Sequence, residues 1–112
     1  MFRNFLVPDR RAMTISAKNI GFIGTGKMGE ALIKGILNAK LFTPDKIYAS
    51  DIDTTRLKSL EKTYGINTCN NNCDPVLNSD IIIIAVKPQI VPKVIEEILH
   101  GVLGYDDVTV NP

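Results

Sequence analysis

Apolar residues follow two different spacings along the chain from residue 19 onward. Four short runs have the apolar character of buried β-strands: residues 20–23, 46–50, 66–69 and 80–86. The segments between them carry apolar residues every three or four positions, which is typical of amphipathic helices. Strands that alternate with helices pair in parallel through right-handed crossovers. The pattern predicts an α/β fold with a doubly wound, mostly parallel Rossmann-type sheet.

The run 80–86 (DIIIIAV) is the clearest of the predicted strands. Its consecutive isoleucines predict burial on both faces, as at the centre of a parallel sheet. A further strand is predicted to begin at residues 108–110, and the sequence ends two residues later. We therefore expect the sheet to be incomplete at its carboxyl end.

Four helices are predicted between and after these strands. The first is predicted from residues that recur at helical spacing among good helix formers: Met28, Ala31, Leu32, Gly35, Ile36 and Ala39. The second is capped by Asp53 or Thr54 and ends at Gly65, with an apolar face made of Leu57, Leu60 and Tyr64. A brief third helix is expected to begin with Asp74 as its N-cap and Pro75 in its first turn. Pro92 opens the fourth helix, whose apolar face is Val91, Val94, Ile95, Ile98 and Leu99.

A glycine motif joins the first strand to the first helix: Gly24, Thr25, Gly26, Lys27, Met28 and Gly29. After a strand and before a helix, this spacing indicates a dinucleotide-binding turn. Gly24 would make the tight turn, Gly26 would let the backbone approach a pyrophosphate, and Gly29 would let the helix pack on the sheet. The N–H groups of the first helical turn would then face the phosphates. Lys27 either approaches a phosphate or is merely solvated.

Ser50 and Asp51 follow the second predicted strand, with Asp51 twenty-two residues after the last glycine of the motif. An acid at this place accepts hydrogen bonds from the ribose of NAD and repels the 2′-phosphate of NADP. Ser50 offers a hydroxyl and Arg56 a cation to a phosphate, so we expect dual use of the cofactors with a tilt toward NAD. The alternative is that Asp51 is a turn or capping acid that points away from the cofactor.

A second candidate contact lies at the end of the run 80–86: Ala85, Val86, Lys87 and Pro88. A strand end at the binding edge of such a sheet can touch the nicotinamide half of a dinucleotide through its backbone. Pro88 pushes Lys87 toward an extended conformation. The alternative is an ordinary connection from strand to helix.

Composition excludes several classes of protein. The net charge is +1, which gives no electrostatic basis for binding nucleic acid, and no apolar run is long enough to span a membrane. Two cysteines and one histidine are too few for a four-ligand zinc site, so no metal site is predicted. Residues 1–18 are arginine-rich and form either a flexible tail or an extension that precedes a true start at Met13; a transit peptide is less favoured. We expect a cytoplasmic protein.

These stretches together resemble the amino-terminal cofactor domain of the pyrroline-5-carboxylate reductase family. The residues that carry the resemblance are 20–31 (IGFIGTGKMGEA), 47–50 (IYAS) and 81–89 (IIIIAVKPQ). The glycine opening is shared with β-hydroxyisobutyrate-type dehydrogenases and F420-dependent NADP reductases, whereas the ending Ala-Val-Lys-Pro is more particular to the pyrroline reductases. The resemblance implies that residues 85–88 lie against the cofactor and that Asn72 contacts its adenosine side. As an alternative, Asn72 holds a turn.

The resemblance also implies a function for the complete protein. Family members transfer hydride from NADPH or NADH to 1-pyrroline-5-carboxylate and form L-proline. Their all-helical carboxyl-terminal domain forms the dimer and, with its partner, the substrate pocket. This domain has no counterpart in the sequence, so residues 19–112 are expected to be a partial, truncated dinucleotide-binding domain that is inactive alone, and no catalytic residue is assigned.

Two other functions fit the same residues. One is a separate dinucleotide-sensing module that performs no chemistry. The other is the cofactor domain of a related hydroxyacid dehydrogenase.

Overall fold

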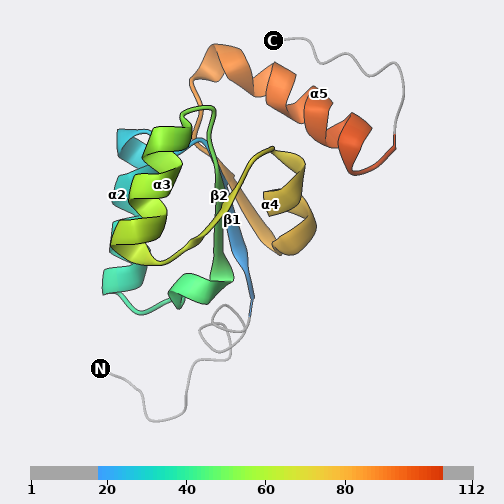
Figure 1. Ribbon diagram of the computed structural model, residues 1–112. Coiled ribbons are helices and arrows are strands. Elements are labelled where there is room, and N and C mark those ends of the chain that lie inside the picture. The colour runs from blue at the N-terminus through green and yellow to red at the C-terminus, as the bar shows by residue number, and fades with distance from the viewer. Residues whose placement is uncertain (1–17, 105–112) are drawn as a thin grey trace.

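The computed structural model describes residues 18–104, which alternate strands with helices (Figure 1). In chain order the elements are β1 (Ile20–Ile23), α2 (Lys27–Asn38), the 3₁₀ turn η1 (Pro44–Lys46), β2 (Ile47–Ser50), α3 (Thr54–Tyr64), β3 (Asn67–Cys69), α4 (Cys73–Asn78), β4 (Ile81–Ile84), the 3₁₀ turn η2 (Pro88–Ile90) and α5 (Val91–Gly101). The strands form one parallel sheet in the order β3-β2-β1-β4. The predicted α/β fold with a parallel Rossmann-type sheet is confirmed. The strand predicted at 108–110 lies outside the described residues.

Helices cover both faces of the sheet (Figure 1). Helices α2 and α3 lie on one side, and α4 and α5 lie on the other. The buried core includes Phe22, Ile33, Ile47, Leu57 and Leu60, which come from β1, β2, α2 and α3. None of the helices within residues 18–104 is long and apolar enough to cross a membrane.

The buried side of α2 differs from the set of residues whose spacing predicted the helix. Ile33, which the prediction omitted, is completely buried, whereas Met28 is 71% exposed and Leu32 is 39% exposed. Gly29 and Ile33 are one helical turn apart and face the sheet together. The lack of a side chain at Gly29 lets this side of the helix approach the Gly24 carbonyl oxygen, which would lie 2.8 Å from a Cβ at this position.

The position predicted for the isoleucine strand was also wrong. Strand β4 lies at the end of the described sheet, and Ile81–Ile84 are all half-buried. The fully buried strand is β1, which has β2 on one side and β4 on the other. Within residues 18–104, β4 pairs only with β1, so neighbouring backbone protects it along a single edge.

The helix ends are set by polar side chains. Asp53 is the N-cap of α3, with its Oδ1 accepting from the Arg56 N–H at 3.1 Å, and Gly65 ends that helix with φ of 74°. The predicted start of α4 was wrong: the helix begins at Cys73, one residue before Asp74. The Oδ1 of Asn71 accepts from the N–H groups of Cys73 and Asp74, at 3.0 and 2.9 Å, and so satisfies the first turn in place of Asp74.

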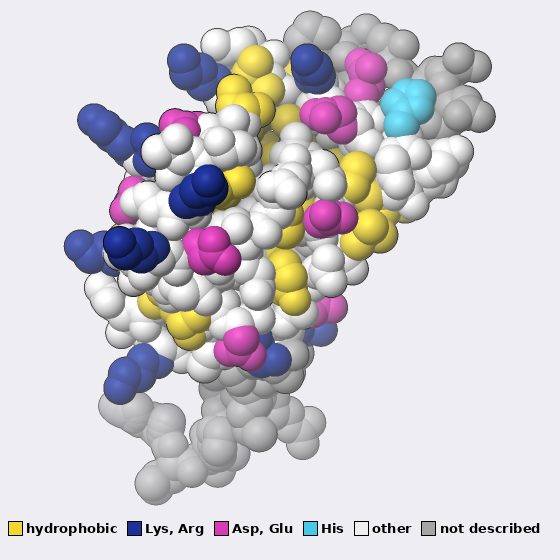
Figure 2. Space-filling model, viewed as in Figure 1, with side chains coloured by type: hydrophobic (Ala, Val, Ile, Leu, Met, Phe, Trp, Pro, Cys, Tyr) yellow, Lys and Arg dark blue, Asp and Glu magenta, His cyan; other side chains and the backbone are white. Residues whose placement is uncertain are grey.

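Charged side chains of both signs are interspersed on the face drawn in Figure 2. Lys and Arg side chains are most frequent on the side of α2 and α3. Apolar side chains appear between the charged ones. This mixed surface fits the net charge of +1.

Candidate functional site: the carboxyl edge of the parallel sheet

Three segments that the sequence singled out meet where β1, β2 and β4 end. The Gly24 N–H donates to the Ser50 carbonyl at 2.9 Å, which joins the glycine turn to the end of β2. The Ala85 N–H donates to the Ile23 carbonyl at 2.7 Å, which joins the end of β4 to the end of β1. The strand order reverses at β1: the chain runs outward from β1 to β3 and then returns to place β4 on the other side of β1. In doubly wound sheets, ligands bind at this edge and at this switch in strand order.

Two glycines are required by the packing of the turn itself. Gly24 has φ of +91°, and a Cβ there would lie 2.8 Å from Cγ1 of Val86. A Cβ on Gly29 would lie 2.8 Å from the Gly24 carbonyl oxygen. The glycine turn therefore packs directly against the end of β4 and against the first turn of α2.

Gly26 differs from both, because a Cβ at this position would meet no protein atom within 4 Å. It is the N-cap of α2, and having no side chain it cannot cap the helix. The first bond within the helix runs from the Glu30 N–H to the Gly26 carbonyl at 2.9 Å. The N–H groups before Glu30 thus lack helical acceptors and point toward the open space at Gly26. Lys27 and Met28 are exposed beside this space.

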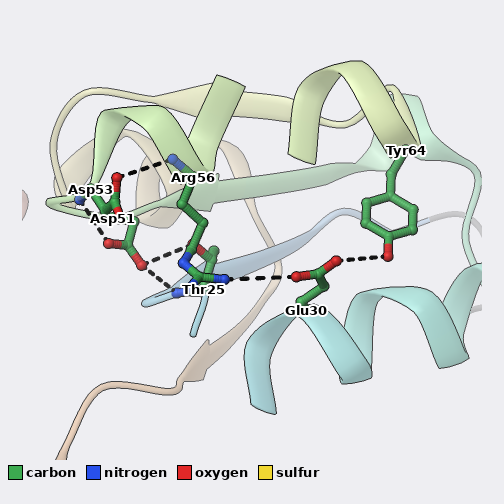
Figure 3. A network of polar contacts seen from close by, with 6 residues as sticks. All are labelled: Thr25, Glu30, Asp51, Asp53, Arg56 and Tyr64. Atoms are coloured by element: carbon green, nitrogen blue, oxygen red, sulfur yellow. Dashed lines mark hydrogen bonds and ion pairs between the residues drawn. The ribbon is translucent and has the colours of Figure 1, made fainter. Parts of the chain in front are cut away.

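Asp51 fastens the glycine turn to the end of β2. Its Oδ2 accepts from the Thr25 N–H at 2.7 Å and from the Thr25 hydroxyl at 2.8 Å, while its Oδ1 accepts from the Asp53 N–H at 2.8 Å (Figure 3). Desolvation raises the pKa of Asp51, but these hydrogen bonds and the charge of Arg56 outweigh it and hold the pKa below its ordinary value. The carboxylate thus stays charged at neutral pH. One lone pair of Oδ1 is left for a ligand, and the tilt toward NAD stays a prediction.

Arg56 reaches from α3 toward α2 and forms an ion pair there (Figure 3). Its Nη1 lies 3.7 Å from Oε1 of Glu30, and the two side chains are 37% and 40% exposed. The Tyr64 hydroxyl donates to the other carboxylate oxygen of Glu30, Oε2, at 3.0 Å. This hydrogen bond, together with desolvation and the negative charge of Glu30, raises the pKa of the Tyr64 phenol. Glu30 is therefore held from α3 at two points.

Ser50 and Asn72 are joined by a hydrogen bond. The buried Ser50 hydroxyl donates to Oδ1 of Asn72 at 2.8 Å, and Nδ2 of Asn72 donates to Oε1 of Glu97 at 3.3 Å. Asn72 is the N-cap residue of α4 but makes no capping hydrogen bond with its side chain. The structure thus places Asn72 beside the end of β2. The predicted contact of Asn72 with adenosine stays a prediction.

The segment 85–88 leaves the sheet beside the glycine turn. Ala85 and Val86 are half-buried against it, and Lys87 and Pro88 are exposed. Lys87 has the extended backbone expected before a proline, with φ of −59° and ψ of 144°. Two of the three segments that carry the resemblance, 20–31 and 81–89, are therefore in contact.

Sequence reasoning missed Glu30 and Tyr64. They lie 34 residues apart and come together only because α2 and α3 pack side by side. No spacing rule connects residues on two different helices. Sequence reasoning had selected Thr25 as part of the motif but did not foresee that it bonds Asp51.

The fold and this site define a protein of the Rossmann-like, dinucleotide-binding class. Within that class, the chain belongs to the family described as "NADP oxidoreductase coenzyme F420-dependent", whose model matches residues 19–104. The resemblance to the amino-terminal domain of pyrroline-5-carboxylate reductases is confirmed.

Curated relatives of the chain are named pyrroline-5-carboxylate reductases. A pyrroline-5-carboxylate reductase of Methanosarcina acetivorans is 44% identical over 85 residues, which are 76% of this chain and 32% of that protein. Pyrroline-5-carboxylate reductase 2 of Bacillus subtilis is 38% identical over 82 residues, covering 72% of this chain and 30% of that protein. The chain thus spans about a third of the length of the curated relatives it matches.

Solved structures agree with the relatives. The Plasmodium falciparum pyrroline carboxylate reductase with NADP bound matches with a TM-score of 0.64 and 30% identity, over 75% of this chain and 29% of that one. The pyrroline-5-carboxylate reductase of Coxiella burnetii matches with a TM-score of 0.70 and 29% identity, over 80% of this chain and 32% of that one.

Proposed function

We propose that this chain is the dinucleotide-binding part of a pyrroline-5-carboxylate reductase, and that it binds NADP or NAD at the carboxyl edge of its sheet. The observation that carries the proposal is the space at Gly26, which a Cβ would enter without touching the protein, beside the uncapped N-terminus of α2. Backbone N–H groups and the helix dipole favour a phosphate there. A relative of this domain is known with NADP bound, which supports the same choice of ligand.

In this proposal the complete protein reduces 1-pyrroline-5-carboxylate to L-proline. The bound cofactor supplies the hydride for the imine carbon, and a proton completes the product amine. Residues 24–29 hold the pyrophosphate, Ser50, Asp51 and Asn72 lie on the adenosine side, and residues 85–88 contact the nicotinamide half. The names of the relatives support this reaction.

The proposal divides the chain into an extension at residues 1–18 and a dinucleotide-binding domain at residues 19–112. The family match, which begins at residue 19, supports that boundary. The substrate pocket and the contacts of a homo-oligomer belong to a helical carboxyl-terminal domain of the complete protein. We place the protein in the cytoplasm, and its two free thiols, Cys69 and Cys73, fit a reducing compartment.

Two glycine substitutions, one at the N-cap of α2 and one within the helix, test the proposal. NADPH and NADH are titrated against the wild-type chain, Gly26→Ala and the control Gly35→Ala, with binding followed by calorimetry and stability by urea unfolding. A Cβ at either position meets no protein atom within 4 Å, so neither variant is strained by a clash. We expect Gly26→Ala to weaken both cofactors about tenfold or more, because its methyl group occupies the phosphate site, and to cost less than about 1 kcal/mol of stability.

The control separates binding from helix propensity. Gly35→Ala lies in the middle of α2, where alanine stabilises a helix by about 1 kcal/mol, and it should leave cofactor binding unchanged. If the wild-type chain binds neither dinucleotide, or if Gly26→Ala loses stability but no affinity, the proposed function is wrong.

A further inference from the structure

We propose that Glu30 sets the balance between NADPH and NADH by competing with the 2′-phosphate of NADPH for Arg56. The inference rests on the proposed function and concerns the adenosine end of the same site.

Arg56 is the cation that lines an open hollow between α2 and α3. The other lining residues are Glu30, Asp53, Thr55, Ser59 and Leu60. The hollow adjoins the end of β2, since Asp53 donates its N–H to Asp51 and caps α3 through the Arg56 N–H. In dinucleotide-binding domains the residue at the end of this strand faces the ribose, and an arginine nearby accommodates a 2′-phosphate. Arg56 therefore lies beside the expected position of that phosphate.

The ion pair with Glu30 leaves Arg56 free to change partner. The separation of 3.7 Å between Nη1 and Oε1 is longer than a hydrogen bond, and the arginine side chain is 37% exposed. Its guanidinium has five N–H donors in a fork that matches phosphate oxygens. A 2′-phosphate can therefore offer Arg56 shorter, bidentate hydrogen bonds than Glu30 does.

Glu30 cannot follow Arg56 as easily, because Tyr64 holds its second oxygen. The Tyr64 hydroxyl donates to Oε2 at 3.0 Å, a normal hydrogen-bond length (Figure 3). The carboxylate thus remains at the edge of the hollow, where it attracts Arg56 and repels a phosphate. NADH has no phosphate at this place, so its binding leaves the pair intact. Glu30 therefore weakens the binding of NADPH and leaves the binding of NADH unchanged.

The affinity ratio of the two cofactors tests the inference. NADPH and NADH are titrated against the wild-type chain, Glu30→Gln, Arg56→Gln and Lys58→Gln. We expect Glu30→Gln to tighten NADPH about threefold and Arg56→Gln to weaken it about tenfold, while NADH changes less than twofold in both. Lys58→Gln removes a charge from an exposed position of α3 that does not line the hollow, and it should change the ratio less than twofold.

The adenosine halves alone supply a second readout. 2′,5′-ADP and 5′-ADP differ in the 2′-phosphate, so the same variants should change the affinity for the first and not for the second. Tyr64→Phe releases Oε2 of Glu30, so the carboxylate can follow Arg56 and compete for it more strongly; the ratio should shift in the direction opposite to that of Glu30→Gln, and by less.

Two negative results of these titrations would overturn different proposals. If the wild-type chain binds neither dinucleotide, the proposed function is overturned and this inference with it. If both bind and Glu30→Gln moves both affinities equally or not at all, the inference is overturned and the proposed function stands.

Discussion

The glycine turn at residues 24–29 and the Arg56–Glu30–Tyr64 network are neighbours, since Glu30 follows Gly29 directly in α2, and they are held by different forces. The turn is fixed by contacts of its own backbone: a Cβ on Gly24 or Gly29 would come within 2.8 Å of another atom. The network is held by one ion pair of 3.7 Å, whose two side chains are about two-fifths exposed, and by one hydrogen bond of 3.0 Å from Tyr64 to Glu30. Packing of this kind tolerates almost no change, whereas exposed ion pairs contribute about 0–1 kcal/mol. The glycine turn is thus rigid, whereas substitutions in the adjoining network should change its contacts at little cost in stability.

The largest expected effect concerns the packing of α2 against the turn. Gly29→Ala places a methyl group 2.8 Å from the Gly24 carbonyl oxygen, a backbone atom that cannot move away cheaply. We expect a loss of about 1–3 kcal/mol in the free energy of unfolding, measured by urea denaturation. Gly35→Ala on the same helix should instead raise the free energy of unfolding, by about 1 kcal/mol. Equal effects at the two positions would show that the close approach at Gly29 does not constrain the turn.

The next effect concerns Asp51, which joins the turn to the network. Asp51→Asn replaces an acceptor oxygen with a donor facing the Thr25 or Asp53 N–H groups. Hydrogen bonds to a charged group contribute about 1.5–3 kcal/mol when buried; Asp51 is partly exposed, so we expect about 1–2 kcal/mol at pH 7. Both cofactors should bind more weakly, because the turn loosens. A remaining relative gain for NADPH would confirm the predicted tilt of Asp51 toward NAD.

The pH dependence of this effect has a definite sign. The pKa of Asp51 in the folded chain is below its ordinary value of 3.8, so the carboxylate stabilises the fold above pH 3.8. That stabilisation is lost as the pH falls through the folded-state pKa. Unfolding of the wild type and of Asp51→Asn, followed from pH 7 to strongly acid solution, should therefore converge below pH 3.8. A constant difference across this range would contradict a charged Asp51.

The same contrast explains what the sequence could predict. The alternation of parallel strands with helices, the glycine turn, the cap of α3 at Asp53 (one of two candidates) and its end at Gly65 follow from local rules, and the structure confirms them. Local rules do not predict which side of α2 is buried, because hydrophobic spacing cannot show that a glycine lies on that side. They also do not predict the position of β4, because spacing cannot show which strand lies inside the sheet. The pairing of Glu30 with Tyr64 depends on how two helices pack, and nothing near either residue encodes it.

The smallest expected effect tests a local rule in a segment where sequence reasoning chose the wrong residue. Three consecutive asparagines precede α4, and of these Asn71 accepts from the N–H groups of Cys73 and Asp74. Removing such a cap costs about 0.5–2 kcal/mol, and because α4 has only six residues we expect about 0.5–1 kcal/mol for Asn71→Ala by urea unfolding. Asn70→Ala, at an exposed neighbour, is the matched control and should change stability by less than about 0.5 kcal/mol. The short helix supports Asn72 and its bond to Ser50, so Asn71→Ala should also weaken cofactor binding slightly, while Asn70→Ala should not. If the two variants lose equal stability, the turn does not depend on the Asn71 side chain, and the start of α4 is set by its packing on the sheet instead.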